Sequence, residues 1–268
     1  MIFSNSQQQQ RGLIERAKRG SPDALNDLAL CYLEGKNDIR IDQKKAFDLF
    51  QQAADKQFVR AHYNLGLLYE KGWGTDQNYI KAVEHYQIAA KANLPLAQYN
   101  LSLLVLSGLG ADRDPIAAFN LCEQAASHDQ FAQAICNLGW FYLEGIGTEK
   151  DETKASELFY KALDLNLPEA ALMVGECYQR GIAGHAASTD NAIRCYEAAA
   201  NAGNTRAMYQ AGLLYNDPQE AAFDKAKALE WINKAADGNY ELAVHFLSQE
   251  TFKDADNQAF SADITISE

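Results

Sequence analysis

The residues in this sequence that could carry chemistry are glycines in short loops, histidines and cysteines. Three Gly-x-Gly loops, at Gly72–Gly74, Gly108–Gly110 and Gly145–Gly147, are similar to parts of a phosphate cradle. A dinucleotide site needs a preceding strand and the full GxGxxG pattern, and the sequence predicts neither. We therefore expect these glycines to end helices and to form turns.

The histidines and cysteines show no arrangement typical of a site. The five histidines form no HExxH motif or other metal-ligand spacing, and no GxSxG motif occurs. The five cysteines are an odd number without a CxxC pair, which disfavours a zinc site and a full disulfide set. Cysteines at apolar helical positions are typical of core packing in a reducing compartment, and a redox role stays open as the alternative. The sequence thus predicts no catalytic residue, no metal and no cofactor, and we expect a protein that is not an enzyme.

The charge and the hydropathy exclude two classes of partner. The chain has 268 residues, with 36 acidic and 24 basic side chains and a net charge of -12. Nucleic-acid binding needs basic surface to contact phosphates, so this class is disfavoured. No apolar run approaches the roughly 20 residues of a membrane helix, so we expect no membrane insertion. The N-terminal residues lack the pattern of a secretory signal, which favours a cytoplasmic protein, or a periplasmic or secreted one if a signal was removed.

These residues must be positioned by a repeat that runs through almost the whole chain. An alanine recurs at intervals of 36 or 37 residues, and each is followed four residues later by an apolar residue and five later by a small one. These anchor alanines are Ala24, Ala61, Ala97, Ala134, Ala170, Ala207 and Ala243. Offsets 0, 4, 7 and 8 from the anchor share one face of a helix, which we name helix A. The glycine at offset 11 predicts its C-cap, and the small residue at offset 5 predicts close approach of another backbone.

A second helix, helix B, follows in each repeat. It carries a pair of alanines seven residues apart, and a capping residue stands four residues before the first of them. The predicted N-caps are Asp42, Asn78, Asp114, Asp151, Ser188 and Asp224. Their side-chain oxygens can accept an unpaired backbone N–H at the start of helix B.

The fold class that follows is all-α, an α-solenoid of about six helix–loop–helix repeats. The repeats start near residues 24, 61, 97, 134, 170 and 207, and a half-repeat flanks them at each end. We expect a single solenoid over residues 1–248 and an acidic tail over residues 249–268. The tail contains five acidic residues and one lysine and shows no helical period.

The repeat resembles the Sel-one-like repeat family, which is related to the tetratricopeptide repeats (TPR). The resemblance rests on the pattern A-x3-L-G-x2-Y-x2-G-x-G, followed by D-x3-A and a helix B with paired alanines; clear instances are residues 61–74 and 134–147. It covers nearly nine-tenths of the chain. It implies a right-handed superhelix of antiparallel helix pairs that acts as a protein-interaction scaffold. A subgroup with a disulfide in each repeat is a poor match, because most repeats here lack paired cysteines.

The candidate functional surface is the face of helix A that does not face helix B. The tetratricopeptide resemblance implies that this face lines a concave groove, with asparagines at offset 3 that hold an extended ligand. The candidate partner-binding residues, from offsets 2, 3, 6 and 9, are Tyr63, Asn64, Leu67, Tyr99, Asn100, Leu103, Leu106, Asn137, Trp140 and Leu143. An amide can both donate to and accept from a peptide backbone, and exposed aromatic residues are typical interface anchors. The alternative is that Asn and Tyr bond between neighbouring repeats and that curvature buries the leucines. For any single residue both interpretations stay open.

Three functions follow from these patterns. The first is a non-enzymatic scaffold or adaptor that binds a protein or an extended peptide in the groove. The second is a bacterial inhibitor or immunity-type protein that clamps a toxic effector enzyme; the acidic excess is suited to a basic partner in either case. The third, which no nucleophile or base supports, is an enzyme related to β-lactam hydrolysis. The sequence identifies neither the partner nor the oligomeric state.

Overall fold

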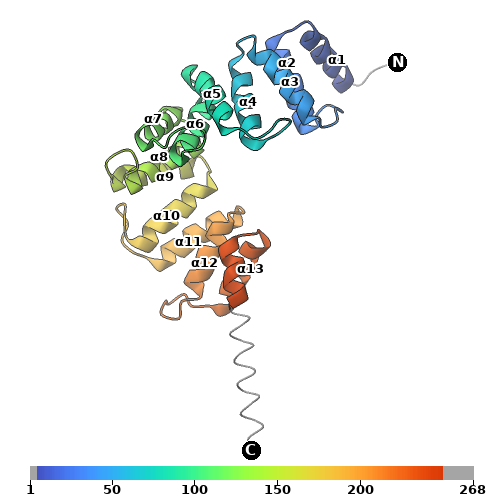
Figure 1. The fold of residues 1–268 in the computed structure, drawn as a ribbon. Helices are drawn as coiled ribbons and strands as arrows, with labels where there is room; N and C mark the ends of the chain where they lie inside the picture. The colour runs from blue at the N-terminus through green and yellow to red at the C-terminus, as the bar shows by residue number, and fades with distance from the viewer. Residues whose placement is uncertain (1–4, 250–268) are drawn as a thin grey trace, which may run out of the picture. The chain divides into compact units, whose positions relative to one another are not determined.

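The structure, a computed structural model, describes residues 5–249, which are helical apart from short turns and loops. No β-strand occurs within this range, and none of its helices is long and apolar enough to span a membrane. The numbered helices, α1 to α13, are labelled in Figure 1. They are α1 (Asn5–Lys18), α2 (Pro22–Glu34), α3 (Gln43–Ala54), α4 (Val59–Lys71), α5 (Tyr79–Lys91), α6 (Pro95–Ser107), α7 (Pro115–Ala126), α8 (Ala132–Glu144), α9 (Glu152–Asp164), α10 (Pro168–Arg180), α11 (Thr189–Asn201), α12 (Thr205–Tyr215) and α13 (Lys225–Asp237). A further helical segment covers residues 241–249. The predicted acidic tail lies almost entirely outside the described residues.

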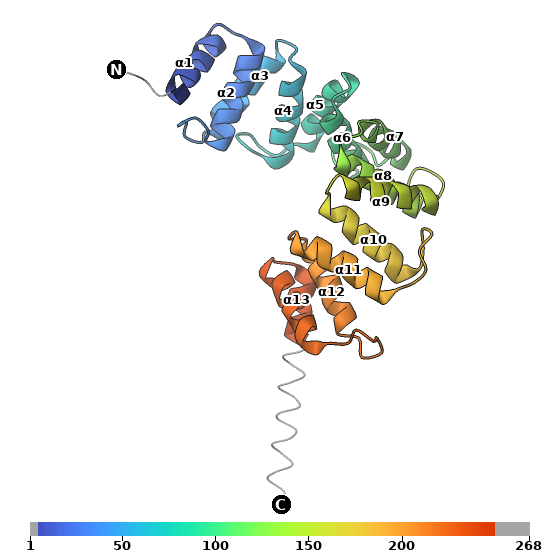
Figure 2. The same ribbon diagram turned by 180° about the vertical axis from the view of Figure 1, so that it is seen from behind.

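The helices form the predicted α-solenoid, and in every repeat except the fourth, helix A packs against the helix B that follows it. Helices α2, α4, α6, α8, α10 and α12 are the A helices, and each is followed by its B helix. Pairs such as α2 with α3 and α4 with α5 pack side by side, as Figures 1 and 2 show. The seven anchor alanines are all 0% exposed, so the repeat period marks the seams of the core. Helix α1 and residues 241–249 occupy the places of the two predicted half-repeats.

The chain divides into two compact units, residues 1–150 and residues 151–268. The boundary falls in the loop between α8 and α9, inside the fourth repeat. Each unit contains the same hairpin packing. A single solenoid over residues 1–248, and the right-handed sense of its superhelix, stay predictions.

Both kinds of helix cap are confirmed. Each of the six predicted N-caps accepts a backbone N–H from two or three residues further on, as when Asp42 accepts from the backbone of Lys45. The first five A helices end at a glycine with φ between 65° and 72°. A left-handed residue here ends the helix, and glycine adopts it without a side-chain penalty. In the sixth repeat α12 ends instead at Asn216 in the right-handed region.

The small residue at offset 5 has a different partner from the one predicted. A Cβ at Gly66 would lie 2.6 Å from the ring of Tyr86, and one at Gly175 would lie 2.7 Å from the ring of Tyr196. The group that approaches is therefore a helix-B aromatic side chain, and the expectation of a close backbone is wrong at these positions. A buried ring needs more space than a helix with a Cβ would leave, which explains why glycine recurs here.

Close backbone approach occurs at the second glycine of each Gly-x-Gly loop. A Cβ at Gly74, Gly110 or Gly147 would lie 2.1 to 2.2 Å from a carbonyl oxygen at the start of the preceding repeat's helix B. All three glycines also have φ near +70°. These loops therefore hold neighbouring repeats together, and a side chain at the second glycine would separate them.

Candidate functional site

The three asparagines at offset 3 bond to the preceding repeat. Asn64 Nδ2 donates to Asn26 Oδ1 at 2.8 Å, Asn100 Nδ2 donates to the Tyr86 hydroxyl at 3.2 Å, and Asn137 Nδ2 donates to the Tyr99 hydroxyl at 3.2 Å. Each bond joins helix A of one repeat to a helix of the repeat before it. Of the two interpretations of the asparagines, the inter-repeat bond is therefore present. An amide has two N–H donors and a carbonyl acceptor, so one such bond leaves capacity for a ligand.

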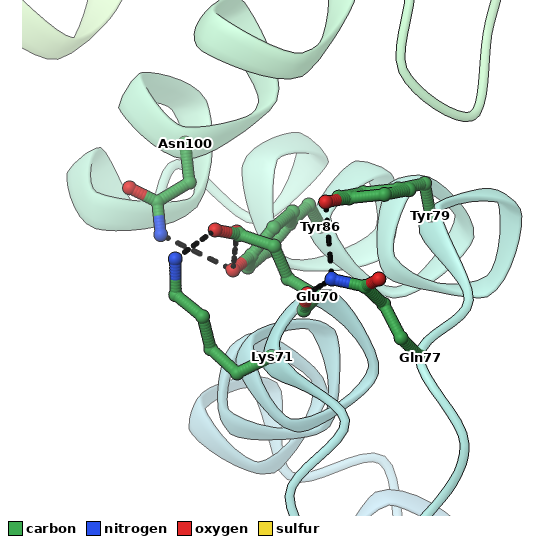
Figure 3. Close-up of polar contacts among 6 residues, drawn as sticks. All are labelled: Glu70, Lys71, Gln77, Tyr79, Tyr86 and Asn100. Carbon is green, nitrogen blue, oxygen red and sulfur yellow. Dashed lines mark hydrogen bonds and ion pairs between the residues drawn. The ribbon is translucent and has the colours of Figure 1, made fainter.

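Asn100 belongs to a polar network around Tyr86 on the second and third repeats (Figure 3). The Tyr86 hydroxyl donates to a Glu70 carboxylate oxygen at 2.9 Å, and the same carboxylate pairs with Lys71 Nζ at 2.7 Å. Tyr86 itself is 0% exposed. Burial, with the negative charge of Glu70, raises the pKa of the Tyr86 hydroxyl. Tyr86 therefore keeps its proton, donates to Glu70 within the second repeat and accepts from Asn100 of the third.

The same network continues into the loop that follows helix A. Gln77 Nε2 donates to the backbone oxygen of Glu70 at 2.8 Å and to the Tyr79 hydroxyl at 3.0 Å. Gln77 thus satisfies a carbonyl at the end of α4, where the helix has no partner of its own. Gln77 therefore links the end of helix A to Tyr79, the first residue of helix B.

The two tyrosines of the candidate set are half-buried and packed on other rings. Tyr63 lies 5.9 Å from Tyr86 between ring centroids, and Tyr99 makes an edge contact with Phe131 at 5.3 Å. Burial raises the pKa of Tyr63, and the Asn100 side chain opposes this by a hydrogen bond. Both rings are therefore oriented by the fold, with part of each surface accessible.

The apolar residues at offset 6 form a row along the A helices of the first unit. Leu67, Leu103 and Trp140 stand at this offset, as does Leu30, which was not among the candidates. Leu103 is 36% exposed and the other three are half-buried. We name Leu30, Leu67, Leu103 and Trp140 the apolar row. Offset 6 also predicts Leu30 as a residue of this surface, because Leu30 stands six residues after the anchor Ala24.

The two candidates at offset 9 differ from each other. Leu106 is half-buried, but Leu143 is only 1% exposed. The expectation that Leu143 contributes to a partner-binding surface is wrong, because a side chain without accessible surface cannot contact a partner. Sequence spacing does not separate the two, since they share one helical register.

Two histidines of the second repeat, His62 and His85, are part of the packing. His62 Nδ1 lies 3.0 Å from His85 Nδ1, and the His85 ring stacks on Tyr69 with a 12° angle between planes. Burial lowers the pKa of His85 to about 4, helped by the nearby His62 and Lys81. Burial also lowers the pKa of His62. The neutral pair shares one hydrogen bond inside the second repeat. Among the described residues no group of three or more His, Cys, Asp or Glu is arranged to hold a metal ion.

A serine–histidine contact that the sequence did not reveal lies in the second unit. Ser156 Oγ is 3.3 Å from His185 Nε2, and the His185 ring packs on Tyr178 with 4.3 Å between centroids. The backbone N–H of Ala183 donates to Glu152 at 2.9 Å. Both contacts fasten the long loop after α10 to helix α9, so they account for the arrangement without catalysis.

The cysteines are placed in the core or at its edge. Four are buried and Cys195 is half-buried. Burial raises the pKa of Cys122 to about 12 and that of Cys177 to about 11. A thiol reacts as its thiolate, so these cysteines are poor nucleophiles in the folded protein.

Comparison with known proteins gives several curated relatives, of which the chain covers only part. Chitin synthase regulatory factor 2 of Schizosaccharomyces pombe is 30% identical over 240 residues, which are 85% of this chain and 46% of that protein. DAP3-binding cell death enhancer 1 of Rattus norvegicus is 38% identical over 191 residues, or 70% of this chain and 37% of that protein. The chain thus spans less than half the length of these relatives.

Solved structures share the fold. A Sel1 repeat protein from Oxalobacter formigenes matches with a TM-score of 0.75 and 26% identity, over 87% of this chain and 97% of that one. The immunity protein PA5088 of Pseudomonas aeruginosa matches with a TM-score of 0.52 and 20% identity, over 84% of this chain and 82% of that one, which is a likeness of fold alone.

The family model named Sel1 repeat matches six consecutive segments: residues 22–58, 59–94, 95–129, 132–167, 168–204 and 205–240. Each segment contains one helix A and the helix B that follows it. The described hairpins, their caps and the matched segments agree in register, and the chain belongs to the Sel1 repeat family.

Proposed function

We propose that this chain is a non-enzymatic scaffold that binds a protein partner through the A helices of its first unit. Sel1 repeats generally serve in protein–protein interaction, and one relative is named for binding another protein. The observation that carries the finer proposal is the apolar row. Four apolar side chains stand at one offset of consecutive repeats, and each keeps accessible surface. Leu30 also packs against the core, and the Trp140 ring contacts that of Phe141. The part of the row that stays accessible is apolar surface of the kind that marks interaction sites.

An extended peptide segment is the occupant that the row supports best. Beside the row, the amides of Asn64, Asn100 and Asn137 repeat once per hairpin and are held in place by their bonds to the preceding repeat. A fixed amide binds a peptide group with less loss of entropy than a mobile one. Trp140 would supply the largest apolar contact, since tryptophan is enriched among residues that dominate binding energy.

A peptide-display experiment tests this proposal. Random twelve-residue peptides are selected on the full chain, and the affinity of the selected peptides is measured for variants. We expect Leu103→Asp and Trp140→Ala to weaken binding at least tenfold, roughly the 1.4 kcal/mol or more that loss of an interface anchor costs. The control is Ile88→Asp on helix B α5, where Ile88 is 46% exposed but outside the row. Equal effects of Leu103→Asp and Ile88→Asp would refute a site on the A helices.

An inhibitor of a basic enzyme is a second candidate, favoured by where the charge lies. Residues 151–268 contain 19 acidic and 9 basic side chains, whereas residues 1–150 contain 17 and 15. A strongly acidic unit raises the association rate with a basic partner. We expect this chain to block such an enzyme by forming a stoichiometric complex with it, and we expect the complex to dissociate at high salt. β-Lactam turnover by the purified chain, measured with a chromogenic substrate, would instead favour the enzyme hypothesis.

A further inference from the structure

Two pockets in the first unit occupy equivalent places in the repeat. One lies among α1, α2 and α3 and has a volume of about 320 Å³. The other lies among α5, α6 and α7 and has a volume of about 300 Å³. Both stand at the lower end of the size range of small-molecule sites. Neither includes a residue of the apolar row.

The two pockets share most of their lining. The first contains Ala17, Lys18, Leu28, Leu49 and Gln52. The second contains the same residue types two repeats later, as Ala90, Lys91, Leu101, Leu121 and Gln124. The shared part of each pocket therefore consists of leucine and alanine walls with a lysine and a glutamine; the first pocket also contains Lys45 and the second Gln87. The matching residues come from three helices in each pocket. The two linings agree because each of these helices has the same residue types at the same positions of the repeat.

The second repeat has different residues at this place. His85 stands where the first pocket has Leu49, His62 stands where it has Leu25, and Asp55 replaces the lysine. The two imidazoles meet at 3.0 Å across the position. The histidine pair thus fills the place of the pocket, and the charge at its edge is reversed.

The chemistry of the lining selects for an apolar group that ends in an anion. Leucine and alanine walls favour an aliphatic chain, and a lysine ammonium beside them makes charge-assisted hydrogen bonds to a carboxylate. Lys18 is 68% exposed and pairs with the exposed Glu15 at 2.9 Å. An exposed pair of this kind contributes little stability, so a ligand carboxylate can replace Glu15. In the first pocket Lys45 adds a second ammonium, 4.4 Å from the centre of the Tyr32 ring.

A buried amide adjoins the second pocket. Gln98 is 2% exposed, and its Nε2 donates to the Ala90 carbonyl and to Gln124 Oε1, both at 3.4 Å. Ala90 and Gln124 are two of the residues that line this pocket. The buried Gln98 side chain therefore orients Gln124 through a hydrogen bond.

We propose that each of these two pockets binds a short aliphatic chain that ends in a carboxylate. The same chemistry occurs in a free fatty acid of about eight carbons and in a peptide that ends in leucine. The site is separate from the partner-binding face and does not depend on it.

Calorimetric titration of the full chain with sodium octanoate tests the proposal. We expect two sites, no binding of octanamide, and weaker binding as salt rises. Acetyl-Ala-Ala-Leu with a free or an amidated C-terminus forms the second arm. Tighter binding of the free peptide than of octanoate identifies a protein C-terminus as the source, and the reverse identifies a free acid. Equal binding of octanoate and octanamide, or no binding in either arm, would overturn the proposal.

Lysine variants assign the sites. Lys18→Gln and Lys91→Gln should each weaken one of the two sites roughly threefold to tenfold, as expected for loss of a charge-assisted hydrogen bond near solvent. Lys36→Gln is the matched control, because Lys36 is also 68% exposed and also pairs with a nearby glutamate but lies outside both pockets. Equal effects of all three variants would contradict the assignment.

A gain-of-site variant tests the same idea in the opposite direction. The triple substitution Asp55→Lys, His62→Leu and His85→Leu gives the second repeat the residues of the first pocket at these positions. We expect the number of octanoate sites to rise from two to three in a protein whose helical circular dichroism is unchanged. A folded variant that still binds two would show that these residues do not define the site.

Discussion

At the scale of single residues, the histidine pair predicts how stability depends on pH. The pKa of His85 is about 4 in the folded protein and near 6.5 when unfolded. The unfolded chain therefore binds more protons between these values, so the free energy of unfolding falls as the pH drops from 6.5 towards 4. His85 is half-buried, so solvent screening limits the loss to about 1–2 kcal/mol.

Chemical denaturation at pH 7 and pH 4.5 measures this loss. The control is His85→Leu, which has the residue type found at the same position in the first and third repeats. Its stability should change less over this interval than that of the wild type. An equal change in both proteins would place the responsible groups elsewhere.

Gln98 gives a second prediction at this scale. Its Oε1 is the one buried side-chain oxygen or nitrogen among the described residues that has no hydrogen-bond partner. The equivalent position in the first repeat is Leu25. An unmatched buried carbonyl costs free energy, and the two bonds that Gln98 Nε2 donates are long, at 3.4 Å each. Gln98→Leu should therefore raise the free energy of unfolding, by up to about 1 kcal/mol. The exposed Gln87→Leu is the control, and thermal melting of both variants provides the measurement.

At the scale of helices, glycine decides how closely helices A and B approach. Gly66 lies under the Tyr86 ring, where a Cβ would meet ring atoms at 2.6 Å. Gly12 in α1 has nothing within 4 Å of an added Cβ. Gly66→Ala should therefore destabilise the protein by about 1–3 kcal/mol through overpacking. Gly12→Ala should stabilise it by up to about 1 kcal/mol, because alanine favours a helix. Urea unfolding measures the free energy of unfolding of both variants. A change of the same sign in both would contradict the packing argument.

At the scale of the whole molecule, stability is distributed over the repeats instead of one centre. Repeat arrays are stabilised mainly by contacts between neighbours. Phe50 in α3 and Phe159 in α9 are both 0% exposed and lie in different units. Truncation of either to Ala should cost about 3–5 kcal/mol.

Hydrogen exchange should localise each loss. We expect Phe50→Ala to reduce protection mainly in α2 to α4 and Phe159→Ala to reduce it mainly in α9 to α11. Uniform loss of protection in both variants would indicate a single cooperative unit. The net charge is also distributed unevenly between the two units, because the second unit contributes -10 of the total -12.

The sequence alone determined the repeat, its register, both helix caps and the buried alanines. These features are local: a cap depends on residues two or three positions away, and an anchor alanine recurs at every seam. Only the tertiary structure decided which side chains of the helix-A face are accessible and what they bond. Asn64 meets Asn26, 38 residues away, and Leu143 is buried although Leu106 shares its offset. The pockets show the same limit, since three helices must come together before the lining of each exists. The periodicity of the sequence specifies the helix face on which a residue lies. Whether that residue is buried depends on side chains from neighbouring repeats, which are distant in the sequence.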